Sequence, residues 1–258
     1  YELNETGKYQ VFFEETQGTA LFKQYIWASG NSGFALTGVG RNPQEYPTVS
    51  IENGIDGSRA IKLETKSTGQ FGETVKMPIA AGNLFLGSFD VNNAVQKPLK
   101  ATRFGLPFGK KPLQLKGYYK YTPGTQPFKA KDKNGNTVTI PGQEDEGDIY
   151  AVLYEAAELD GKALDGNNVL TSENIVALAR VEVEKKDEFT AFHVDFHYGS
   201  RIPIDWPKFI QDQRDPSDDG TAPYLSFSEE KMKNYEYNLA VVFTSSKYGA
   251  YFAGSVGS

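Results

Sequence analysis

The sequence predicts an all-β protein, built as a single antiparallel β-sandwich. Apolar and polar side chains alternate strictly over residues 113–121, which is typical of a half-buried strand with one face in solvent. The 258 residues include 26 Gly and 13 Pro, which suits many short strands joined by tight turns. Helix signals are weak, with one short helical turn expected at 228–235, so we expect a helix content below about a tenth.

The N-terminal third contains several short predicted strands separated by turns. Residues 1–8 are polar and are expected to form a loose lead-in to the sandwich domain, which we place at 9–258. A first strand, ending in two carboxylates, is predicted at 9–15, and long ordered loops with short strands are predicted at 16–47. Further strands are expected at 48–51, 59–65 and 80–89.

The strands that follow 113–121 are more apolar. Residues 148–154 and 239–246 are apolar on both faces, which indicates covered central strands. Alternation in 175–184 and 189–198 predicts a hairpin between these two segments.

Two irregular excursions interrupt this series. The first, 125–147, includes Lys133-Asn-Gly-Asn136, which resembles a two-residue hairpin turn. The second, 199–233, holds Trp206. Irregular segments on a rigid scaffold are where binding residues concentrate.

Composition argues against several kinds of partner. The net charge is −6 and the basic residues are scattered, so nucleic acid is not an expected partner. The absence of cysteine rules out a disulfide frame and thiolate chemistry. No apolar run approaches the roughly 20 residues of a membrane helix. The sequence begins at Tyr1 without Met, so we expect a processed or trimmed chain.

Seven segments in register resemble the putative carbohydrate metabolism domain family of Bacteroides-type envelope lipoproteins. They are Phe12-Phe13-Glu14, 57–65, 80–87, Pro107-Phe108, 111–124, 147–154, and a C-terminal group of Phe243-Thr-Ser-Ser246, Gly249, Phe252, Gly254 and Gly257-Ser258. The resemblance implies a jelly-roll-like sandwich and a carbohydrate role. It also implies an exported protein of the cell envelope, periplasm or outer-membrane surface, attached to the membrane only through a lipid anchor outside this chain. The family offers no established catalytic residues. Two departures are the end at Ser258, where the family usually continues with one more strand, and the long 199–233 excursion.

The favoured ligand site is the excursion around Trp206, whose ring could stack on a sugar. Its polar neighbours could bind hydroxyl groups: Asp205, Gln211, Asp212, Gln213 and Arg214. The alternative is that Trp206 is a loop anchor packed on the sandwich.

Two further aromatic residues are candidate glycan contacts. Trp27 lies in a Gly-rich loop segment, and Tyr118 is on the polar face of the 113–121 strand beside Lys116 and Lys120. Each single ring has the same alternative of an ordinary packing role.

His193, Asp195 and His197 form a His-x-Asp-x-His pattern on a predicted strand. The outer histidines of such a pattern stand roughly 13 Å apart, too far to share a metal, so a solvated strand face is the favoured interpretation.

Carboxylates suggest a structural calcium ion, which takes six to eight oxygen ligands. Glu14 and Glu15 at the end of the first strand are the candidates, by analogy with carbohydrate-binding sandwiches. Two acidic groups are alternatives that are more simply solvated clusters: Glu144, Asp145, Glu146 and Asp148, and Asp215, Asp218 and Asp219.

The sequence therefore favours a non-catalytic domain that binds a glycan or polysaccharide. The first alternative is a structural or adhesion subunit that assembles with an envelope protein partner by strand addition. The second is a glycoside hydrolase that uses a carboxylate pair; no nucleophile elbow, metalloprotease or P-loop motif is present.

Overall fold

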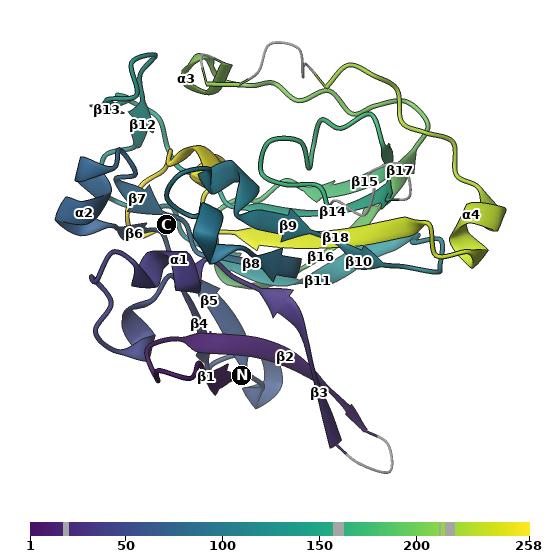
Figure 1. Cartoon of the computed structure of the whole chain (residues 1–258), viewed down its shortest axis with the longest axis horizontal. Coiled ribbons are helices and arrows are strands. Elements are labelled where there is room, and N and C mark those ends of the chain that lie inside the picture. Colours follow the sequence, from purple (N-terminus) through teal and green to yellow (C-terminus); the bar gives the residue numbers. More distant parts are fainter. Residues whose placement is uncertain (18–20, 157–162, 212, 215–219) are drawn as a thin grey trace.

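The structure is a computed structural model that describes residues 1–17, 21–156, 163–211, 213–214 and 220–258 (Figure 1). Four short α-helices occur in the described residues: α1 (Asn31–Ala35), α2 (Gly69–Thr74), α3 (Lys208–Gln211) and α4 (Glu229–Lys233). The predicted helical turn at 228–235 is confirmed as α4, because Ser228 caps it by accepting a hydrogen bond from the amide of Lys231. None of the described helices is long and apolar enough to cross a membrane.

One large antiparallel sheet organises the molecule. Its strands run in the order β1 (Glu2–Leu3), β2 (Gln10–Gln17), β3 (Leu21–Ala28), β8 (Asn83–Phe89), β18 (Tyr237–Thr244), β14 (Asp148–Glu155), β15 (Ile175–Val181) and β17 (His197–Tyr198). β9 (Thr102–Phe104) pairs with β8, and β10 (Leu106–Pro107) pairs with β18.

Smaller pairs of strands surround this sheet. They are β11 (Gln114–Tyr121) with β16 (Lys186–Asp195), β12 (Lys129–Lys131) with β13 (Thr137–Thr139), β4 (Thr48–Ile51) with β5 (Ala60–Leu63), and β6 (Lys66–Ser67) with β7 (Ile79–Ala80). The predicted strands at 48–51, 59–65 and 80–89 are therefore confirmed as β4, β5 and β8.

The β11–β16 pair covers one face of the large sheet. Leu115 of β11 and Phe192 of β16 pack with Ile149 of β14 and Val181 of β15. The predicted alternation of β11 is confirmed, because its residues are alternately exposed and half-buried along the whole strand. The opposite face of the sheet holds a second apolar cluster, which includes Tyr150, Val152 and Val242. The antiparallel sandwich predicted from the sequence is confirmed.

Three local predictions need correction. β15 and β16 do not form a hairpin: β16 pairs with β11, and the chain then returns as β17 to pair with β15. Residues 16–47 contain the eight-residue strand β3, which forms with β2 a hairpin that extends away from the rest of the molecule (Figure 1). The β12–β13 turn spans 132–136, because Asp132 closes it by accepting from the amides of Asn134 and Asn136.

Candidate functional site

Two rows of side chains cross the central strands on the face opposite β11–β16. Partners directly opposite each other in an antiparallel sheet point to the same face. The first row is Phe85, Val242, Tyr150 and Arg180, and the second is Asn83, Thr244 and Asp148. All seven residues line one cavity of about 210 Å³.

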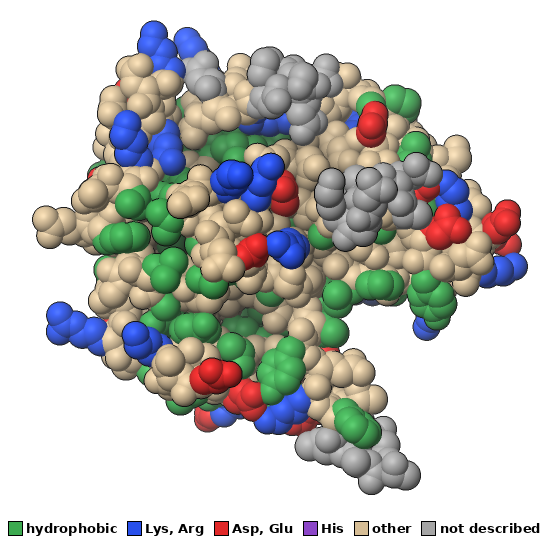
Figure 2. All heavy atoms as spheres, viewed as in Figure 1, with side chains coloured by type: hydrophobic (Ala, Val, Ile, Leu, Met, Phe, Trp, Pro, Cys, Tyr) green, Lys and Arg blue, Asp and Glu red, His purple; other side chains and the backbone are tan. Residues whose placement is uncertain are grey.

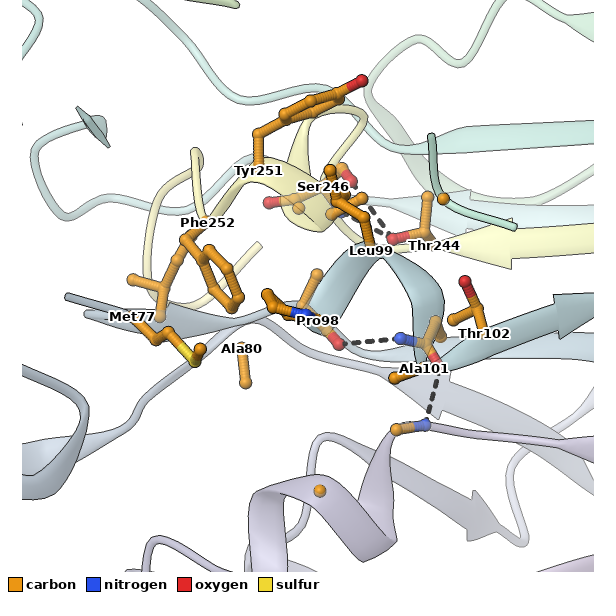
Figure 3. A pocket seen from close by; sticks show the side chains of 18 of the residues that line it. Met77, Ala80, Pro98, Leu99, Ala101, Thr102, Thr244, Ser246, Tyr251 and Phe252 are labelled. Carbon is orange, nitrogen blue, oxygen red and sulfur yellow. Dashed lines mark hydrogen bonds between the residues drawn. The ribbon is translucent and has the colours of Figure 1, made fainter. Parts of the chain in front are cut away.

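The other walls of this cavity are mostly apolar, and part of them comes from short segments laid over the sheet (Figure 3). Met77, Ala80, Pro98 and Leu99 lie on this side, together with Phe252. Pro98 begins a 3₁₀ turn, Pro98–Lys100, which is closed by a hydrogen bond of 3.1 Å from the amide of Ala101 to the carbonyl of Pro98. A proline fits this first position because its missing N–H would have no partner there.

Asp148 and Arg180 form the charged centre of the sheet face. The Arg180 guanidinium donates two hydrogen bonds to the carboxylate, of 2.9 Å from Nε and 2.6 Å from Nη2. The Asp148 side chain is only 4% exposed and that of Arg180 is 20% exposed. Burial opposes the charged guanidinium, but the adjacent carboxylate outweighs it and raises the pKa of Arg180. The guanidinium therefore stays charged, and its two hydrogen bonds hold the pair in one geometry.

Tyr150 lies between this ion pair and the apolar wall. It stands opposite Arg180 in the sheet and is 6% exposed. Burial, reinforced by the Asp148 charge, raises the pKa of the Tyr150 phenol, so the hydroxyl is neutral and can donate a hydrogen bond.

Aromatic rings from the C-terminal segment and the long excursion close the cavity. Trp206 packs edge-on against Tyr251, with ring centroids 6.2 Å apart, and tilts against Tyr248 at 6.5 Å. The guanidinium carbon of Arg214 lies 4.0 Å from the centroid of the Trp206 ring. The buried indole N–H of Trp206 has no hydrogen-bond partner in the part of the chain that the structure describes. A buried donor without an acceptor is uncommon and suggests a missing ligand or water.

Lys247 also lines the cavity, and its ammonium group donates a 2.8 Å hydrogen bond to Glu146. Burial lowers the pKa of Lys247, but the hydrogen bond from Lys247 to Glu146 and the charges of Tyr248 and Glu146 together outweigh it, so the net shift is upward. The rim of the cavity thus carries a charged donor next to the Asp148–Arg180 pair.

A family model described as "Putative carbohydrate metabolism domain" (PCMD) matches residues 1–258. The chain belongs to this family. PCMD is a carbohydrate-related family, so a carbohydrate-related role is supported for this domain.

Two solved structures are similar to this PCMD chain. One, described as a putative glycoside hydrolase from Bacteroides thetaiotaomicron, is 41% identical with a TM-score of 0.78, and the match covers 99% of this chain. This chain spans 65% of that protein. The other, a putative glycoside hydrolase from Bacteroides vulgatus, is 36% identical with a TM-score of 0.75, and the match covers 96% of this chain and 86% of that one. No curated protein matches the chain significantly.

Of the Trp206 group predicted from the sequence, only Trp206 itself lines the cavity of this PCMD domain. Arg214 stacks on its ring, and the Gln211 amide donates a 2.6 Å hydrogen bond to the Trp206 carbonyl. Asp205 is exposed, and the Gln213 amide donates to the carbonyl of Phe209 at 2.7 Å. Asp212 lies outside the described residues, as do three acids proposed for calcium: Asp215, Asp218 and Asp219.

The structure does not bring Trp27 or Tyr118 to this cavity. Trp27 contacts Phe243. The preceding residue, Val242, lines the cavity, so Phe243 and Trp27 lie on the opposite face of the sheet. Tyr118 is 61% exposed on the outer face of β11. The predicted aromatic contacts therefore lie in three separate places.

The His-x-Asp-x-His pattern does not lie on one strand. β16 ends at Asp195, and His197 belongs to β17 in the large sheet. His193 and His197 are both exposed, and Asp195 accepts a 2.6 Å hydrogen bond from Gln114.

The acids proposed for calcium are also dispersed. Glu14 and Glu15 are exposed neighbours on β2, and Glu14 accepts a 2.7 Å hydrogen bond from the Trp27 indole. In the second group Asp145 accepts from Ser246 and Glu146 from Lys247. The described residues contain no cluster of three His, Cys, Asp or Glu residues that could hold a metal. A calcium ion at Glu14 and Glu15 stays a prediction.

The sequence interpretation missed Asp148 and Arg180, although a signal was present. Each is a charged residue inside an otherwise apolar strand, in Asp148-Ile-Tyr-Ala-Val-Leu and Ile175-Val-Ala-Leu-Ala-Arg-Val181. Charged residues are almost never buried unless they are paired. An acid at the start of one covered strand and an arginine near the end of the other therefore pointed to a buried pair, although β14 also ends in a second acid, Glu155.

Proposed function

We propose that the cavity binds a carbohydrate and does not cleave it. The observation that supports this function is the buried Asp148–Arg180 ion pair beside Trp206 and Tyr251 in one cavity. Sugars offer C–H faces to aromatic rings and hydroxyl groups to charged partners. A cavity with a few fixed polar groups among apolar ones is the usual form of a small-molecule site.

The polar groups match the needs of a sugar hydroxyl. Asp148 can accept on carboxylate lone pairs not used by Arg180, and Tyr150 can donate or accept. The Trp206 N–H lacks an acceptor among the described residues, and a ligand oxygen would supply one.

Binding is favoured over hydrolysis because the cavity lacks a suitable carboxylate pair. Of the described residues that line it, Asp148 is the one acid. Glycosidases place two carboxyl groups about 5 to 9.5 Å apart, and one of them must be protonated to act as an acid. Asp148 accepts two hydrogen bonds from the Arg180 guanidinium, which suits an acceptor and not a proton donor.

The test is a glycan array with soluble protein, followed by calorimetry on each hit and a reducing-end assay after long incubation. We expect binding without the release of new reducing ends. Release that is lost in Asp148→Asn would show a glycoside hydrolase instead. No binding to any glycan would reject the function.

Lys247→Met gives a local test of the site. The substitution removes the ammonium group at the rim and keeps most of the stem, and we expect affinity to fall by about 1 kcal/mol. Lys186→Met is a matched control, since Lys186 also makes a 2.8 Å ion pair, with Glu184, but lies on β16. Both variants should fold normally, because exposed ion pairs contribute little stability.

A second candidate is assembly by strand addition, for which the β2–β3 hairpin provides a surface. β3 pairs with β8 only through Trp27 and Ala28, so the rest of its outer edge has no strand beside it among the described residues. Phe22 and Tyr25 are 60% and 54% exposed there. Sedimentation velocity tests it: wild type should self-associate or bind an envelope partner, and Tyr25→Lys should not.

We also propose an exported, envelope-associated setting, supported by the two Bacteroides relatives. Cell fractionation of a Bacteroides host that expresses the full-length protein tests this. Recovery in the cytoplasmic fraction would exclude it.

A further inference from the structure

The cavity extends beyond the two rows of side chains on the central strands. Beyond Asp148 and Arg180 it continues along a wall formed by Phe71, Val75, Met77, Pro98, Leu99 and Phe252. Figure 3 shows Met77, Pro98 and Phe252 gathered around one open space, with Ala80 at its edge. This apolar end comes from α2, the 3₁₀ turn Pro98–Lys100 and the segment after β18, so it is built by parts of the chain far apart in sequence.

The apolar end reaches the surface. Phe71 and Val95 both line the cavity, yet they are 39% and 36% exposed. Figure 2 shows hydrophobic side chains gathered on the left of this face, around α2. Exposed apolar groups at the mouth of a cavity mark a binding groove more often than an ordinary surface.

Phe252 lines this wall with a strained backbone. Its φ of 57° and ψ of 33° are in the left-handed region, which bulky residues rarely adopt. Such conformations persist where the surrounding structure holds them, and they cluster at sites that clamp ligands. Phe252 adopts this conformation with its ring in the cavity wall.

A bare sugar does not fit this end. Its hydroxyl groups would lose water and find few partners among these side chains, at a cost for each group. We propose that the cavity takes a carbohydrate that carries an apolar substituent, such as an acyl ester or an alkyl or aromatic aglycone. The substituent lies against Met77, Pro98 and Phe252, and the sugar lies against Asp148, Arg180 and Trp206. This inference rests on the proposed carbohydrate site for the polar half of the ligand.

The experiment compares methyl and hexyl glycosides of glucose, galactose and mannose by calorimetry, below the concentration at which the hexyl forms aggregate. Each methylene group that is buried should raise affinity about fourfold. We expect a hexyl glycoside to bind at least about tenfold more tightly than the methyl glycoside of the same sugar. Equal affinities for every sugar would overturn the inference.

Two variants that fill the apolar end show where the chain binds. Ala80→Leu and Val75→Phe add volume from different elements, β7 and the end of α2, so one can replace the other if it folds poorly. We expect the ratio of hexyl glycoside affinity to methyl glycoside affinity to fall to near onefold. Ala191→Leu on the exposed face of β16 is the matched control and should keep the full advantage. An advantage that survives both filling variants would contradict this site.

1-Hexanol separates this inference from the proposed function. In the first outcome, hexanol binds, Ala80→Leu blocks it, and no glycoside binds. The proposed carbohydrate site is then wrong, and so is the inference that the ligand is a glycoside with an apolar substituent. If methyl glycosides bind and neither hexanol nor hexyl glycosides show an advantage, the carbohydrate site stands and the apolar site is wrong.

Discussion

Arg180 on β15 and Asp148 on β14 are joined by two parallel hydrogen bonds beneath a solvent-accessible cavity, although the two strands are otherwise almost wholly apolar. The pair is diagonal in the sheet, because Arg180 stands opposite Tyr150 and Asp148 opposite Thr244. Asp148 and Thr244, which stand opposite each other, both line the cavity.

Asp148→Asn should lower the free energy of unfolding by about 3 kcal/mol, since it leaves the Arg180 charge buried without its anion. Urea denaturation measures the change. The double variant Asp148→Leu/Arg180→Leu is the control, and it should recover most of the lost stability. If Asp148→Asn is as stable as wild type, water in the cavity solvates the Arg180 guanidinium.

Trp206→Phe should weaken glycan binding by about 1 kcal/mol and leave the stability of the free protein unchanged or slightly higher. The reason is that the N–H it removes has no acceptor among the described residues. Calorimetry and thermal unfolding measure the two effects. Trp206→Ala should instead lose both, with about 1–3 kcal/mol of affinity and about 2 kcal/mol of stability, because its half-buried ring packs on Tyr248 and Tyr251. Unchanged affinity in both variants would leave Trp206 as a loop anchor alone.

Asp145 should make an unusual contribution to the pH dependence of stability. Burial raises its pKa above the ordinary 3.8, despite hydrogen bonds from Ser246 and the Ser255 amide. The folded state then holds a proton that the unfolded state has released, so this contribution decreases as pH rises from about 3.8 through the folded pKa. The stability of wild type relative to Asp145→Asn should therefore increase as the pH is lowered from 7 toward 4. Urea titrations of both proteins between pH 7 and pH 4 measure this relative stability. A wild-type stability that falls relative to Asp145→Asn as the pH is lowered would contradict the prediction.

The calcium prediction at Glu14 and Glu15 has a direct test. If the ion binds only the native state, excess EDTA should lower the melting temperature, and added Ca²⁺ should restore it. Glu14→Gln should remove this response while keeping a partner for the Trp27 N–H. An unchanged melting curve in EDTA would exclude a structural ion there.

Local patterns were enough to predict most of the strands, with β3 as an exception, but not their partners. The alternation in β11 is visible in nine residues and is confirmed. The same alternation in β15 and β16 shows which side chains face inward, but it does not distinguish pairing with each other from pairing with distant strands. The predicted hairpin was wrong because β16 packs on the face of the large sheet, through Phe192 and Val194, and does not pair with β15 at its edge.

The cavity could be predicted only in part. Trp206 stood out as a tryptophan in an irregular segment, and it does line the cavity. The charged residues that line the cavity come from β14, β15 and the segment after β18. These residues are separated from Trp206 by 26 residues or more in the sequence. Asp132 is a similar case on a smaller scale, since its side-chain bonds to Asn134 and Asn136 enlarge a turn whose sequence indicates a shorter one.

The position of β18 has a consequence for the synthesis of the protein. β18 lies between β8 and β14 in the sheet, yet it is made after both of them. Until residues 237–244 leave the ribosome, β8 and β14 each present an unpaired edge, and the cavity has no floor between Phe85 and Tyr150. The central sheet can therefore close only after β18 has been made, and nascent chains that stall before β18 should be prone to aggregate or to need a chaperone.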